Sequence, residues 1–115
     1  MKAGLIISIL PYFFALLLFY SLAIHMHQSL DGWPKIIGTD GFPAMLLIHD
    51  KITGIYITCL LLLTVFIVPA NILICLLIPR WRHLVIYCVA HLASLPICFA
   101  LMQLAPRDFL YWWWD

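Results

Sequence analysis

Three long apolar runs constrain this chain more than any other feature of its sequence. They cover residues 4–24, 52–79 and 83–104, and a helix needs about 20 mostly apolar residues to cross the hydrocarbon of a bilayer. Of the 115 residues, 66% are hydrophobic and 10% are charged, against roughly 45–50% and about 25% in soluble domains. We therefore predict an all-α integral membrane protein with three transmembrane helices, at about 4–25, 52–79 and 83–104.

The two connections between these runs differ in character. The second is the tight sequence PRWR at 79–82, which predicts that the last two spans form an antiparallel hairpin. The first carries the turn signals Asp31-Gly32 and Asp40-Gly41 but also much apolar surface. We expect one three-helix domain over 1–115, in which segment 26–50 lies as an apolar lid across the outer end. Asp40 as a cap, with Pro43 in the first turn, predicts a helix from about residue 42 into the second span.

Topology follows from run length and from the basic residues. The first run exceeds the roughly 7–15 residues of a signal-peptide core, so we expect a retained helix. Arg80 and Arg82 are concentrated in the tight turn, and short loops rich in Lys and Arg stay cytoplasmic. We therefore predict a cytoplasmic N-terminus and an outside C-terminus, in a plasma membrane or a bacterial inner membrane.

Polar side chains follow helical stripes on the second and third spans. The third-span stripe runs from His83 to Cys98 in steps of three and four. Antiparallel helices joined near residue 81 hold residues at equal depth when their numbers add to about 162, which places Asn71 level with His91. The first span brings Tyr12 to a similar depth. We predict an intramembrane polar cluster consisting of Tyr12, Thr64, Asn71, Tyr87, His91 and Ser94.

The chain ends in RDFLYWWWD. Leu104 ends the last span and Pro106 stops its helix, so this tail is expected at headgroup depth. Tyr and Trp favour that zone because their rings are apolar while their O–H and N–H groups need polar partners. We predict an aromatic belt that anchors the third helix at the interface, with protein docking as the alternative role. Its members are Tyr111, Trp112, Trp113 and Trp114.

Metal and haem sites receive weaker support. His25, His27, His49 and Asp50 are candidate ligands near the outer surface, since imidazole and carboxylate groups bind zinc and related ions, but their spacing is unspecific. His91 is deep enough to ligate a b-type haem, yet no histidine of the second span is level with it. We predict no metal and no cofactor, with haem b as the alternative. The cysteines at 59, 75, 88 and 98 lack CxxC spacing and are expected to act as small apolar residues.

Function is the least constrained property. A net charge of +1 without a Lys/Arg cluster argues against nucleic acid as a partner. The sequence contains no GxSxG, HExxH or glycine-rich phosphate loop, so we expect no enzyme. No Asp or Glu lies within an apolar run, although proton-driven transporters usually place one there. The leading hypothesis is a non-catalytic accessory or assembly subunit that binds other membrane chains or itself. A haem- or quinone-binding anchor for electron transfer and a small-solute or ion pathway are the alternatives.

Overall fold

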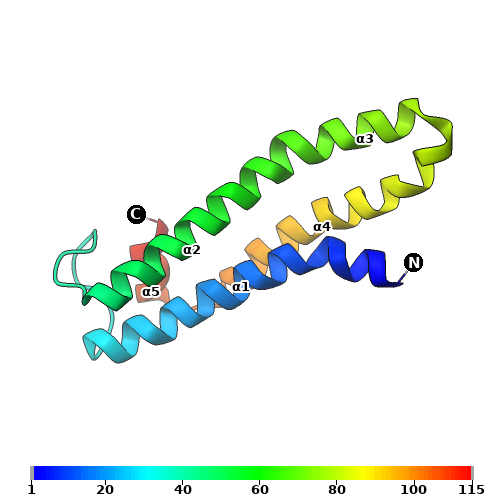
Figure 1. Cartoon of the computed structure of the whole chain (residues 1–115). Coiled ribbons are helices and arrows are strands. Elements are labelled where there is room, and N and C mark those ends of the chain that lie inside the picture. The colour runs from blue at the N-terminus through cyan, green and yellow to red at the C-terminus, as the bar shows by residue number, and fades with distance from the viewer. Residues whose placement is uncertain (1, 115) are drawn as a thin grey trace.

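The computed structural model describes residues 2–114, and every regular element in that range is a helix (Figure 1). Three helical stretches, Lys2–Leu30, Ala44–Leu77 and Pro79–Met102, are long and apolar enough to cross a membrane, which confirms the predicted helical class. The elements in chain order are α1 (Lys2–Leu30), α2 (Ala44–Leu62), the π-helix η1 (Leu63–Ile67), α3 (Val68–Leu77), the 3-10 helix η2 (Pro79–Leu84), α4 (Val85–Met102) and α5 (Arg107–Trp114).

Helix α1 continues further than the predicted boundary at residue 25. It ends at Leu30 because Asp31 adopts a left-handed conformation, with φ 56°. The N–H of Gly32 then donates to the carbonyl of His27 at 3.1 Å, which is the six-to-one hydrogen bond of a Schellman helix end. The Asp-Gly turn signal was therefore correctly placed, and the helix simply extends up to it.

The non-helical connection is shorter than the predicted lid. Of segment 26–50, residues 26–30 belong to α1 and residues 44–50 to α2, so only 31–43 join the two helices. Pro43 is the residue before α2, and its carbonyl accepts the N–H of Leu47 at 3.0 Å. Trp33 and Phe42 of the connection pack against the core, as the apolar composition of this segment requires.

The second long helix contains one wide turn, η1, directly before Pro69. The N–H of Val68 donates to the carbonyl of Leu63, five residues earlier rather than four. Pro69 has no N–H, and its ring crowds the carbonyl of Val65 in a regular α-helix, so a π turn relieves the clash at this position. The wide turn shifts the helical phase of everything after it by about one residue.

The chain reverses direction between α3 and α4. Ile78 is extended, with φ −103° and ψ 107°, as expected for a residue before proline, and the N–H of Trp81 donates to the carbonyl of Ile78 at 2.9 Å. In Figure 1 the η2 turn lies at the same end of the molecule as the N-terminus, whereas connection 31–43 and α5 lie at the other end.

Helix α1 is the central element, since it packs against both α2 and α4. Its buried side chains lie along one face: Tyr12, Ala15, Phe19, Leu22, Ala23 and Met26. The molecule is 56 Å long and 22 × 21 Å across, whereas a hydrocarbon core is about 30 Å thick. The molecule is therefore longer than a hydrocarbon core is thick, and connection 31–43 and α5 gather aromatic side chains at one of its ends.

Candidate functional site

A polar cluster joins the three long helices near the middle of the bundle. The Thr64 hydroxyl lies 2.5 Å from the Tyr12 hydroxyl and 2.9 Å from Nε2 of His91. Nδ1 of His91 lies 2.9 Å from the carbonyl oxygen of Ser8. Tyr12, Thr64 and His91 are all buried. One side chain from each of α1, η1 and α4 therefore meets at Thr64, and no charged group takes part.

The hydrogen bonds allow two arrangements of the protons around Thr64, according to whether one or both ring nitrogens of His91 carry a proton. A carbonyl only accepts, so Nδ1 of His91 carries a proton and donates it to Ser8. In neutral imidazole Nε2 is then an acceptor, so the Thr64 hydroxyl donates to it and the Tyr12 hydroxyl donates to Thr64. The Leu60 carbonyl lies 2.8 Å from the same Thr64 oxygen. If Nε2 also carried a proton, the Thr64 oxygen would accept hydrogen bonds from His91 and from the Tyr12 hydroxyl. The Thr64 hydroxyl would then donate its own proton to the Leu60 carbonyl.

Side chains of the other helices bond the backbone of α1 around Pro11. The Pro11 carbonyl accepts the Tyr56 hydroxyl at 2.8 Å, and the Tyr12 carbonyl accepts the Cys98 thiol at 3.7 Å. Together with Ser8, three carbonyls of this stretch receive a donor from α2 or α4. The carbonyl that Pro11 itself leaves without a helical partner is that of Ile7, four residues earlier, so these three bonds are made in addition to the one that the proline removes. Pro11 thus marks the position at which α1 is held by both neighbours.

Not every predicted cluster residue joins this site. Ser94 does, since its hydroxyl donates to the His91 carbonyl at 2.5 Å and its side chain is buried. Tyr87 lies towards the N-terminal end of α1, where its ring sits directly against Gly4. The structure therefore brings together Tyr12, Thr64, His91 and Ser94, and sets Tyr87 apart.

Asn71 departs from the prediction, because its side chain is exposed. In a regular α-helix Thr64, Ile67 and Asn71 would share one face, but after Thr64 the buried positions are Val68 and Cys75. The π turn before Pro69 explains the difference, because one extra residue in a turn rotates all later side chains. Asn71 and Ile67 consequently lie on the outer face of the bundle.

The aromatic tail is a helix that folds back onto the bundle. Phe109 of α5 is fully buried, and its ring lies 5.0 Å from that of Phe19. Trp113 also contacts Phe19, at 5.2 Å, and Trp112 donates its indole N–H to the Gly38 carbonyl at 2.8 Å. Tyr111 and Trp114 are exposed. The predicted anchor residues thus divide into a packed pair and an exposed pair. Phe109, which the sequence analysis did not single out, is the centre of the packing.

The four candidate metal ligands lie at the same end but do not converge. Nδ1 of His25 lies 2.9 Å from Nδ1 of His49, while the ring of His27 packs on Trp33 at 4.9 Å. Asp50 borders a different hollow, with Trp112 and Trp113. Over residues 2–114 no group of three or more His, Cys, Asp or Glu side chains is arranged to hold an ion.

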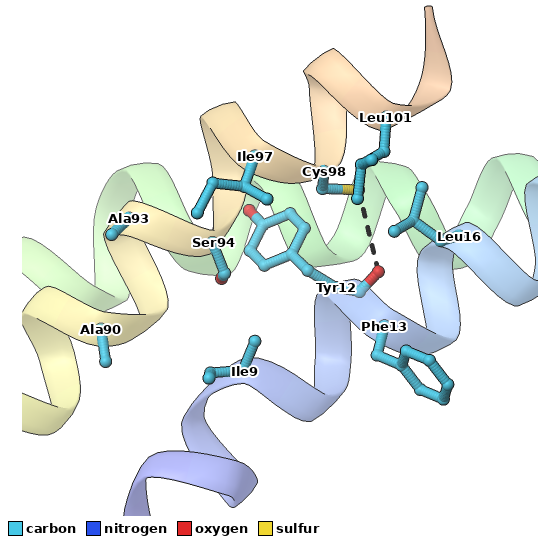
Figure 2. Close-up of a pocket in the computed structure, with 10 residues that line it drawn as sticks. All are labelled: Ile9, Tyr12, Phe13, Leu16, Ala90, Ala93, Ser94, Ile97, Cys98 and Leu101. Carbon is cyan, nitrogen blue, oxygen red and sulfur yellow. Dashed lines mark hydrogen bonds between the residues drawn. The ribbon is translucent and has the colours of Figure 1, made fainter. Parts of the chain in front are cut away.

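Two apolar hollows flank the polar cluster. One, of about 380 Å³, lies between α1 and α4; Figure 2 shows Tyr12 reaching from α1 towards Ser94 of α4 and the Cys98 thiol bonded to the Tyr12 carbonyl. The other, of about 340 Å³, opens between α2 and α4, with Trp113 and Trp114 closing one end. Tyr12 lines both hollows. They have the size and character of sites for apolar chains rather than for polar solutes.

No protein-family model, no curated protein and no solved structure matches this chain.

Proposed function

We propose that this chain is a non-catalytic integral membrane subunit that works by lateral association with other membrane chains, through the outer face of α3. The observation that carries this proposal is the outward position of Asn71. The proposal also takes the last two spans as a membrane hairpin, with Lys2, Arg80 and Arg82 on the cytoplasmic side.

Asn71 lies at a depth where lipid surrounds it. It is eight residues before Pro79, which at 1.5 Å per residue is about 12 Å along the helix. Half of the hydrocarbon core is about 15 Å, so a turn at the interface leaves Asn71 within acyl chains. Its exposed neighbours Ile67, Leu73 and Ile74 are all apolar. An amide therefore interrupts an otherwise lipid-compatible face.

The energetics of an amide in hydrocarbon favour a partner. Moving such a group from water into a medium without hydrogen bonds costs roughly 4–8 kcal/mol. A hydrogen bond to another helix restores about 0.6–1.7 kcal/mol in membranes. Because a carboxamide both donates and accepts, Asn71 suits a second copy of this chain as well as a different subunit.

The low burial of the spans agrees with this role. Only 22%, 22% and 17% of the residues in the most apolar window of the three spans are buried inside the chain. A protein that works by enclosing a substrate would turn more of its spans inward. Here the inner polar groups are bonded to one another, and most of the span surface is available to lipid or to other chains.

Site-specific photocrosslinking in membranes tests the proposal. A photoreactive amino acid at Ile74, beside an unchanged Asn71, is expected to give a discrete protein adduct, while the same probe at Phe13 gives lipid adducts only; both positions are exposed. The probe at Ile74 combined with Asn71→Leu should lose the adduct, and with Asn71→Gln it should keep it. Equal adducts at positions 74 and 13 would refute the proposal. The adduct mass distinguishes a second copy from another subunit.

The α2–α4 hollow supports one second candidate, an anchor that holds a quinone or a similar ring with an apolar chain. The hollow is lined by Leu60, Met102 and Phe99 among others, and the Tyr12 side chain borders it. Haem has less support, because both ring nitrogens of His91 are already bonded within the chain. Quenching of the Trp113 and Trp114 fluorescence by a short-chain quinone, reduced by Leu60→Trp, would favour this candidate; unchanged quenching would exclude it.

A further inference from the structure

Two histidines face one another where the end of α1 meets the start of α2. The Nδ1 atoms of His25 and His49 are 2.9 Å apart, and the ring centroids are 5.1 Å apart. The two nitrogens therefore point directly at each other. Both side chains are half-buried, and connection 31–43 links the two helices that carry them.

The neighbouring groups show which nitrogens carry protons. The Ser21 hydroxyl donates to the Leu18 carbonyl at 2.9 Å, so its oxygen accepts the proton of Nε2 of His49, at 3.0 Å. With Nε2 protonated, Nδ1 of neutral His49 presents a lone pair, and His25 donates its Nδ1 proton to it. The lone pair of His25 is then on Nε2. Ser21 holds His49 in the tautomer whose Nδ1 is free to bind an electrophile.

We propose that His25 and His49 form a binding site for a divalent transition-metal ion of the Cu²⁺, Ni²⁺ or Zn²⁺ type, held between the two Nδ1 atoms. The His25 proton moves from Nδ1 to Nε2 through solvent, so both rings stay neutral and no other bond changes. Two nitrogens each about 2.1 Å from an ion lie about 3.0–3.4 Å apart. The two Nδ1 atoms, now 2.9 Å apart, would thus have to separate by only a few tenths of an ångström. The rings would also have to rotate so that each Nδ1 lone pair points at the ion instead of at the other nitrogen.

The rest of the coordination shell would be water. Asp50 lines the hollow beside Trp112 and Trp113, His27 packs on Trp33, and in residues 2–114 no third His, Cys, Asp or Glu is placed to complete a group of ligands with this pair. Two imidazoles suit copper, nickel and zinc, with copper binding most tightly. Such an ion would cross-link α1 and α2, the two helices that connection 31–43 joins. Binding confined to the folded state raises stability by mass action.

Thermal unfolding of the purified, untagged chain in mild detergent tests the site. Added NiCl₂ or ZnCl₂ is expected to raise Tm by several degrees in a saturable manner, and EDTA should reverse the rise. His25→Ala and His49→Ala should abolish the shift, whereas the matched variant His27→Ala should keep it. A shift that survives in the His25→Ala/His49→Ala double variant, or no shift in the parent chain, would overturn the proposal.

Electron paramagnetic resonance of the Cu²⁺-loaded parent chain keeps the proposal testable if the alanine variants fold poorly. Two imidazole ligands are expected to give superhyperfine splitting from two equivalent nitrogens. The spectrum of aqueous Cu²⁺, or that of a single nitrogen ligand, would contradict a shared site. The outcome is independent of the proposed association through Asn71, because neither histidine lies on α3.

Discussion

Thr64→Val is the most informative single change, because it removes one hydroxyl and nearly nothing else. The Thr64 oxygen is hydrogen-bonded to both Tyr12 and His91. Hydrogen bonds between membrane helices average about 0.6 kcal/mol, with a maximum near 1.7. Loss of two such bonds should therefore lower the free energy of unfolding by about 1–3 kcal/mol. Valine nearly matches threonine in volume, so no cavity adds to the loss.

Reversible unfolding in mixed micelles, followed by far-UV circular dichroism during an SDS titration, measures this loss. Two threonines of the same long helix serve as controls. Thr53 is buried but bonds only its own helix, through the His49 carbonyl, and Thr58 is exposed. We expect Thr53→Val and Thr58→Val to change stability by less than about 0.5 kcal/mol. If Thr64→Val lost no more than these controls, the cluster would not hold the helices together.

The double variant Tyr12→Phe/Thr64→Val refines the same prediction. After Thr64→Val the Tyr12 hydroxyl is left buried without its acceptor, which adds to the loss. Removing that hydroxyl too should cost less than the sum of the single changes, with a coupling of about 0.5–2 kcal/mol. Strict additivity would mean that the 2.5 Å contact contributes nothing to stability.

Phe109→Ala should release α5 from the bundle and shift tryptophan emission to longer wavelength, and it should lower the free energy of unfolding by about 3–5 kcal/mol if the site cannot collapse. Tyr111→Ala, at an exposed position, should change neither the emission nor the stability, and equal effects of the two variants would contradict the packing of Phe109. Gly4→Ala places a Cβ 2.8 Å from Cζ of Tyr87, so it should lower Tm, and Tyr87→Ala should cancel that effect in the double variant. Haemin added to the purified chain should give no Soret band that depends on His91, because its nitrogens are bonded within the chain; a band lost in His91→Ala would reverse this conclusion.

The part of the fold that could be predicted from sequence is the part set by composition. Run length alone located the three apolar helices, because hydrocarbon tolerates few alternatives to a helix. The Asp31-Gly32 and PRWR signals located the turns. Helix ends were less accurate, since α1 and α2 both extend into polar sequence through His27 and His49, where hydropathy no longer reports the helix.

Helix rotation was predicted only as far as the periodicity stayed regular. Tyr12, Thr64 and His91 lie together as expected, because Tyr12 and His91 lie on other helices and Thr64 is only the second residue of the irregular turn, before the phase shift has accumulated. Asn71 does not, since a π turn shifts the phase by one residue. Pro69 was the available signal: a proline disturbs the turn before it. However, sequence does not reveal whether the helix responds by bending or by widening.

The fold-back of the tail was not predicted, for a different reason. Its aromatic content indicated the membrane interface, but the pattern of Phe109, Trp112 and Trp113 after Pro106 has the three-and-four spacing of an amphipathic helix. Helix α4 ends at Met102, before the proline, and Pro106 directly precedes α5, where the N–H of Leu110 donates to the Pro106 carbonyl at 3.0 Å. Reading the proline as a stop alone concealed the fold-back onto Phe19.

The inner cluster and the outer face of α3 are mechanically connected. In lipid a helix has no hydrophobic force to set its rotation, because acyl chains are as apolar as leucine. The hydrogen bonds of Thr64 to Tyr12 and His91 set the rotation of η1 about its axis. The wide turn then determines which side of α3 faces outward. Hydroxyl and imidazole groups suit this task, since they orient helices without a buried carboxylate or ammonium group. The same network that stabilises the bundle therefore directs Asn71 towards the neighbour that we propose it binds.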